Sequence, residues 1–260
     1  MSERLSFAAV IQAIGLPPDA RVDMRVPKKL LLEQGAPTSA DKRAIQDGLD
    51  ELQWFGACKP TTIGVPAFRD EAREYLEIAV VGCMFRPGAR VARLIELIHR
   101  AIPYPVFLIS QDDGGTRLST AHKRHAQNEA AKTVSELLVV SPPLAAVGEA
   151  ATSEFLSSLS LSGLTSQTLF DIVERWRERI EALDAARKMG SFLLLASQDS
   201  IEKRRLALAK YENLLKERAS LVAQAKRSKQ MNEQVSLNLR IKAIDAEIDR
   251  AKADISGGAS

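Results

Sequence analysis

"HRAIPYPVFLIS", residues 99–110, decides the fold, because it joins an amphipathic helix to an apolar strand within a few residues. The helix is predicted from the preceding run "GARVARLIELIHRAI", in which Leu94 and Ile98 share one face. It must end before Pro103, because the residue that precedes a proline avoids helical geometry. Pro105 then stands near the start of a strand, where a missing backbone N–H costs least. The stretch therefore predicts a helix that leads directly into a sheet.

Further strands and helices are predicted on both sides of this junction. The run "EYLEIAVVGCMF" (74–85) is apolar on both faces toward its end, which indicates a central strand. The run "TSADKRAIQDGLDELQWF" (38–55) has helical spacing, with Thr38 or Ser39 as the capping residue. The remaining segments are predicted to be extended or to form strands: "LPPDARVDMRVPKKLLLEQ" (16–34), "TTIGVPA" (61–67), "RLSTAHKRH" (117–125, as a strand or a turn) and "VSELLVVS" (134–141).

Beyond about residue 150, helical periodicity replaces the strand patterns. The run "TSQTLFDIVERWRERIEALDAARKM" (165–189) is predicted to be one amphipathic helix. A row with coiled-coil spacing follows, and a second row in another phase comes after it; the two rows include Ile201, Leu208, Leu215 and Val222, and then Ile241 and Ile248. Because the phase changes near "KRSKQMN" (226–232), this region is either one long helix with a stutter or a helical hairpin.

These patterns predict an α+β or α/β sheet domain at residues 1–142 and an all-helical, coiled-coil-like extension at residues 150–255. Residues 256–260, "SGGAS", are expected to be a disordered tail. The 260 residues contain no apolar run long enough for a membrane span, no signal-peptide pattern and only two cysteines, which is typical of a cytoplasmic protein.

Positive charge is concentrated in one segment of a chain whose net charge is only +3. Between residues 203 and 229 there are nine Lys or Arg and two Glu. A basic surface of this kind is suited to DNA backbone or to an acidic partner, although a simple solvated helix surface is the alternative. The candidate phosphate contacts are Lys203, Arg204, Arg205, Lys226, Arg227 and Lys229, with Lys28 and Lys29 of "VPKK" and Lys123 and Arg124 of "HKRH".

No pattern of catalytic or metal-binding residues is evident. His122 and His125 are three apart, with Glu129 beyond them, but no further ligand joins them, so no metal site is predicted. No phosphate-binding glycine loop is present, and no cofactor is expected. A diverged Mg²⁺ nuclease that uses Glu74, Glu77 and Lys123 stays open as an alternative, although the usual acidic-x-Lys triple is missing. The chain is accordingly expected not to be an enzyme.

Several short motifs occur in an order that resembles a bacterial family, domain of unknown function 4391. They are "VPKKLLLEQ", "LQWFGACKPTTIGV", "HRAIPYPVFLI", "STAHKRH" and "QMNEQVSLNLRIKAIDAEI". The resemblance runs from about Arg25 to Ile255. The matching positions include Pro27, Lys28, Trp54, Ile102–Pro105 and Lys123. Trp54 and Tyr104 are interpreted as structural, whereas the two lysines are the better functional candidates.

The resemblance implies a functional setting but no catalytic residues. Members of that family are encoded beside helicases and DNA methyltransferases, in cassettes that resemble restriction-modification or phage-defence systems. The chain is therefore expected to be a non-catalytic accessory subunit that contacts DNA and docks a helicase or methyltransferase. A structural homodimer is the third alternative.

Overall fold

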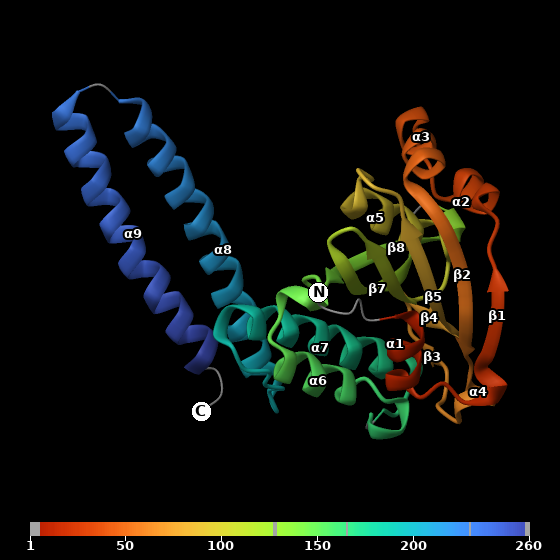
Figure 1. Ribbon diagram of the computed structural model, residues 1–260. Coiled ribbons are helices and arrows are strands. Elements are labelled where there is room, and N and C mark those ends of the chain that lie inside the picture. The colour runs from red at the N-terminus through yellow and green to blue at the C-terminus, as the bar shows by residue number, and fades with distance from the viewer. Residues whose placement is uncertain (1–5, 127–128, 165, 229, 258–260) are drawn as a thin grey trace. The chain divides into compact units, whose positions relative to one another are not determined.

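The computed structural model describes residues 6–126, 129–164, 166–228 and 230–257. A mixed sheet precedes a run of helices, which confirms the predicted α+β class (Figure 1). Contacts divide the chain into two compact units, with the boundary between Asp184 and Ala185, inside α7 (Leu169–Met189). The predicted boundary near residue 142 therefore falls within the first unit.

The first unit is built on a six-stranded sheet in the order β1-β2-β5-β6-β7-β8. Neighbouring strands are antiparallel except β5 and β6, which are parallel. The strands are β1 (Arg21–Arg25), β2 (Leu49–Cys58), β5 (Ile78–Phe85), β6 (Val106–Asp112), β7 (Gly115–Ala126) and β8 (Glu129–Val140).

The parallel pair is connected by the junction that the sequence predicted. Helix α5 (Val91–Ala101) follows β5, and Ile102 at its end is already extended. β6 begins at Val106, and the carbonyl oxygen of Pro105 accepts a hydrogen bond from the N–H of Ala79 in β5. The two prolines thus turn the chain from the helix into the sheet.

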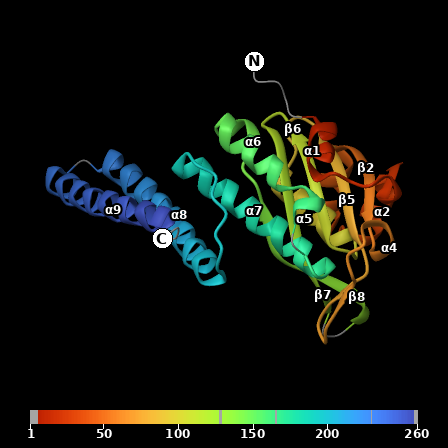
Figure 2. The same cartoon turned by 90° about the horizontal axis from the view of Figure 1, so that it is seen from below.

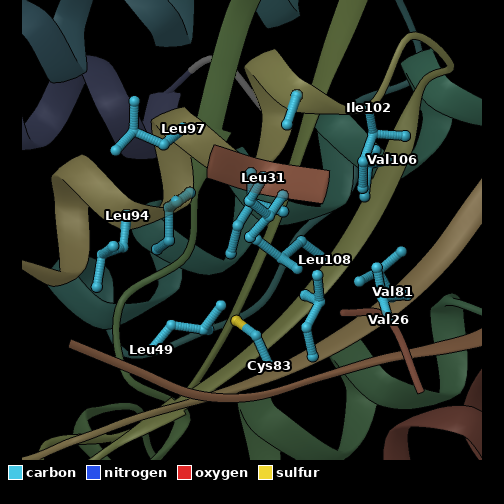
Figure 3. Packing of buried hydrophobic residues seen from close by; sticks show 14 of the residues in the cluster. Val26, Leu31, Leu49, Val81, Cys83, Leu94, Leu97, Ile102, Val106 and Leu108 are labelled. Carbon is cyan, nitrogen blue, oxygen red and sulfur yellow. The ribbon is translucent and has the colours of Figure 1, made fainter. Parts of the chain in front are cut away.

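Helices cover both faces of the sheet. One face packs against α2 (Lys28–Gln34), α3 (Ser39–Gly48) and α5, around a buried cluster that includes Leu31, Leu94 and Leu108 (Figure 3). The other face carries α1 (Phe7–Ile14), α6 (Glu149–Ser158) and the first part of α7 (Figure 2). There Phe107 of β6 contacts Trp176 of α7, with ring centroids 4.5 Å apart.

Three predicted segments differ from the structure. Residues 28–34 form α2 rather than an extended segment, and the predicted helix over 38–55 ends at Gly48, where β2 begins. The predicted strand over 61–67 is wrong, because that region starts with α4 (Pro60–Ile63) and continues as a loop to β3 (Phe68–Arg69) and β4 (Glu74–Tyr75). Short 3-10 turns lie at Pro18–Ala20, Leu144–Ala146 and Leu161–Gly163.

The second unit is a helical hairpin, which decides between the two predicted alternatives. Helices α8 (Gln198–Arg227) and α9 (Met231–Gly257) pack side by side around a core that includes Leu214, Leu221, Leu237 and Ile244 (Figure 1). The helix α9 covers the start of the predicted tail, and residues 258–260 lie outside the described residues. Within the described ranges, no helix is long and apolar enough to cross a bilayer.

Candidate functional site

Basic side chains gather where β5 ends and β2 begins. Lys28, the first residue of α2, is half-buried, and its Nζ donates a hydrogen bond to the carbonyl oxygen of Leu49. Arg86, directly after β5, donates its backbone N–H to the carbonyl oxygen of Gly48, and its guanidinium lies 3.3 Å from Asp50. Burial and the charge of Arg86 both lower the pKa of Lys28, so the two cations interact here.

A hollow of about 390 Å³ lies between α3 and the loop from β5 to α5, and Gly48, whose carbonyl oxygen accepts the Arg86 N–H, is part of its lining. Its wall includes the exposed Arg43 and Arg90 and one exposed carboxylate, Asp47. The remaining lining residues are small: Ala40, Ala44, Gly48, Pro87, Gly88 and Ala89. We call Lys28, Arg43, Arg86 and Arg90 the basic end of the sheet.

An ion pair ties the two walls of the hollow together. Arg93 of α5 donates from Nε to Asp41 Oδ1 at 2.8 Å and from Nη2 to Asp41 Oδ2 at 3.1 Å. The hydrogen bond from Arg93 lowers the pKa of Asp41 to about 2, so the carboxylate is ionised at neutral pH. Two parallel hydrogen bonds fix orientation as well as distance. The ion pair therefore holds α3, which carries Arg43, against α5, which begins directly after Arg90.

The basic end contains only part of what the sequence predicted. Lys28 belongs to it, whereas Lys29 is exposed and forms an ion pair with Glu33 at 3.7 Å. Sequence reasoning missed the arginines of the loop "RPGAR" (86–90), which follows a central strand and precedes a helix. Such loops at the carboxyl ends of strands are the usual place for ligands in sheets with parallel strands, and that position was the available signal.

Lys123 lies in a buried polar cluster. Only 2% of the residue is exposed, and its Nζ donates to the carbonyl oxygen of His99 and, at 2.9 Å, to Ser135 Oγ. Burial lowers the pKa of Lys123 to about 7. The burial contradicts the prediction that Lys123 contacts a phosphate, because β7 directs this side chain toward α5 and away from solvent.

A serine and a histidine meet in the same buried cluster. His99 Nε2 lies 2.9 Å from Ser119 Oγ, and both residues are completely buried. Burial, with a smaller effect of Lys123, lowers the pKa of His99 to about 3, so the imidazole is neutral at pH 7. A substrate could not reach this pair without opening the sheet, and we therefore interpret it as structural.

His122 points to the opposite face of β7 and joins a second network. Its Nδ1 lies 2.8 Å from Tyr75 Oη, and its Nε2 lies 2.7 Å from Glu174 Oε2. The backbone N–H of Lys123 donates to Tyr75 Oη, so the tyrosine hydroxyl links the His122 ring to the backbone of β7. His122 is thus committed to Tyr75 and Glu174, and it lies on a strand rather than on the helix that a metal site with His125 requires.

The acidic residues of the nuclease alternative are paired with cations. Glu74 binds Arg69, and Glu77 lies 3.2 Å from Lys59. Among the described residues, no three His, Cys, Asp or Glu side chains form a group that could hold a metal ion. Lys123 is buried as well, so each of these three side chains is engaged by other parts of the fold.

The basic residues predicted on the hairpin differ in their surroundings. Arg204 is buried, and its Nη1 donates to the carbonyl oxygen of Leu193 at 2.6 Å, which contradicts its prediction as a phosphate contact. Lys203 is exposed and pairs with Asp199, Arg205 is half-buried beside Glu202, and Arg124 of the sheet pairs with Glu136. Lys226 and Arg227 are exposed at the end of α8, and Lys229 lies outside the described residues.

The predicted interaction row on the hairpin is divided between interior and surface. Ile201 and Ile248 are buried, while Leu208, Val222 and Ile241 are half-buried. Leu215 is 40% exposed, because its neighbour Leu214 occupies the core position instead.

Most of the chain matches a known family. The family described as Domain of unknown function (DUF4391) matches residues 14–248. No curated protein and no solved structure matches the chain.

Proposed function

We propose that this chain, which belongs to the Domain of unknown function (DUF4391) family, is a non-catalytic accessory subunit of a bacterial restriction-modification-like or phage-defence assembly. In this proposal the basic end of the sheet contacts the DNA backbone, and the helical hairpin docks a protein partner, either a helicase or a DNA methyltransferase. The observation that carries the proposal is that Arg43 and Arg90, from two separate segments, line one hollow, while Lys28 and Arg86 interact where β2 begins and β5 ends.

The chemistry of the basic end is suited to phosphate. Arg43 and Arg90 both line the hollow and are both exposed, so their guanidinium groups can each reach a ligand there. Guanidinium groups bind phosphate oxygens with two hydrogen bonds, and this contact is the main source of DNA affinity that does not depend on sequence. Asp47 and Asp50 offset part of the positive charge.

The test is a titration of a fluorescent 30-base-pair duplex of random sequence with the full chain at several salt concentrations. The double variant Arg43→Gln/Arg90→Gln is expected to bind at least about tenfold more weakly, and the slope of log K against log salt is expected to fall by about 0.9 for each phosphate that the variant no longer neutralises. Lys210→Gln/Arg250→Gln is the matched control, because it removes the same charge from two exposed positions of the hairpin. Equal affinity and equal slope in both double variants would refute the role of the basic end.

The partner part of the proposal needs a separate measurement. The tagged chain is purified from its native host at low and high salt, and co-purifying proteins are identified by mass spectrometry. Recovery of a helicase or a methyltransferase at both salt concentrations supports the proposal. Recovery of the chain alone, or only of its own dimer, argues against it.

A further inference from the structure

One face of α9 carries exposed apolar side chains near the turn of the hairpin. Met231, Val235 and Leu239 are 77%, 54% and 65% exposed. They are four residues apart and therefore lie on the same face of the helix. The hairpin core uses a different face, which contains Leu237 and Ile244. We call Met231, Val235 and Leu239 the α9 stripe.

The α9 stripe lies in the basic half of the hairpin. Residues 216–242 contain seven Lys or Arg and two Glu, a net charge of +5. The other half of the hairpin, residues 198–215 and 243–257, contains six Lys or Arg and seven Asp or Glu, a net charge of −1. Within the basic half, Lys226, Arg227 and Lys242 are exposed. The half of the hairpin near the turn thus has both regularly spaced exposed apolar side chains and a net positive charge.

We propose that the α9 stripe docks an amphipathic helix of a protein partner, with an apolar row flanked by Asp and Glu. The stripe spans about 12 Å along α9, or about two turns, which matches the anchor spacing of one helix packed on another. Acidic flanks on the incoming helix complement the net positive charge of this half of the hairpin. The inference rests on the proposed function, because it gives the chemistry of the partner that the hairpin would dock.

Two other occupants fit the same surface less well. A second copy that packed stripe against stripe would bring two segments of net charge +5 together, and like charges oppose such a contact. DNA could bind the cations but would leave Met231, Val235 and Leu239 exposed to water, because phosphates offer them no apolar surface.

The test uses the full chain with a benzophenone amino acid at position 239, expressed in the native host and irradiated there. The control carries the same probe at position 206, because Leu206 and Leu239 are both 65% exposed. We expect position 239 to give several-fold more adduct than position 206, and the captured segment to be an amphipathic helix with net negative charge. Equal yields, a captured segment from a second copy of this chain, or a neutral or basic segment would each overturn the proposal.

A binding measurement then separates specific docking from capture by chance. A synthetic peptide of the captured segment is titrated against the full chain, against Val235→Gln/Leu239→Gln and against Leu206→Gln. The double variant should bind at least about tenfold more weakly, whereas Leu206→Gln should bind like the original chain. Unchanged binding by the double variant would overturn the proposal. DNA affinity measured on the same variants should stay constant, so failure of the stripe and failure of the basic end give different results.

Discussion

The buried amine of Lys123 makes the stability of the first unit depend on pH. Its pKa is about 7 in the folded chain, against an ordinary value of 10.5. Between these two pH values the unfolded chain binds more protons than the folded chain. The free energy of unfolding therefore carries no penalty from this amine above pH 10.5, and it decreases as the pH falls toward 7. Integrated between pH 7 and pH 9, the free energy of unfolding should rise by about 2 kcal/mol.

The substitution Lys123→Met removes this dependence and stabilises the fold at pH 7. Because of the same pKa difference, the buried amine lowers the free energy of unfolding by about 4 kcal/mol at pH 7. The variant lacks two hydrogen bonds that are each worth about 1 kcal/mol. The carbonyl oxygen of His99 keeps a donor, because Ser135 Oγ donates to it at 3.2 Å. The expected net effect is an increase of about 2 kcal/mol in the free energy of unfolding.

Urea unfolding at pH 7 and pH 9, followed by tryptophan fluorescence, reports the stability of the first unit, which contains Lys123. Both tryptophans of the chain, Trp54 and Trp176, lie before residue 185. Lys42→Met is the control, because Lys42 is exposed. The original chain and the control should gain stability between the two pH values, and Lys123→Met should not. A Lys123→Met variant that is less stable at both pH values, or that keeps the same pH dependence, would refute the reasoning.

Three other substitutions test the packing. Trp176→Ala should lower the free energy of unfolding by about 3–5 kcal/mol in the same urea assay, because the variant lacks a fully buried ring that contacts Phe107. Tyr75→Phe should cost about 1–3 kcal/mol, because His122 Nδ1 and a backbone N–H lose their partner; a cost near zero would show that water replaces the hydroxyl. Leu221→Ala should cost about 2–5 kcal/mol in the hairpin alone, seen as faster proteolysis beyond residue 185 with unchanged tryptophan fluorescence.

Local pattern predicted the elements whose periodicity was clear. The central strand β5, the helix α5 and the strand β6 follow from apolar spacing and from two prolines. Strand β2 was missed, because Ile45, Leu49 and Leu52 fit helical spacing although the helix ends at Gly48. A Cβ at Gly48 would lie 2.9 Å from Leu94 Cδ1, so Gly48 packs closely on a side chain of α5. That contact between distant segments cannot be read from local sequence.

Of the basic end of the sheet, only the residue that lies in a recognisable basic motif was predicted from the sequence. Lys28 was found from "VPKK", but the basic end also requires α3 and the loop after β5, which only the sheet topology brings together. Lys123 and Arg124 are neighbours in the same basic motif, yet successive residues of a strand point to opposite faces. One is therefore buried against α5 while the other stays partly exposed beside Glu136. Basic composition identifies the residues but not the face on which they lie.

The hairpin shows why a correct period can still give the wrong buried residues. Apolar pairs recur every seven residues along α8: Ala207-Leu208, Leu214-Leu215 and Leu221-Val222. Consecutive residues of a helix are about 100° apart, so a single partner helix can cover only one member of each pair fully. The hairpin buries the first member each time, and the second stays half-buried or exposed. Together with the α9 stripe, α8 thus leaves apolar surface that the hairpin core does not use. That surplus is the physical reason why we propose the hairpin as the unit that docks a protein partner.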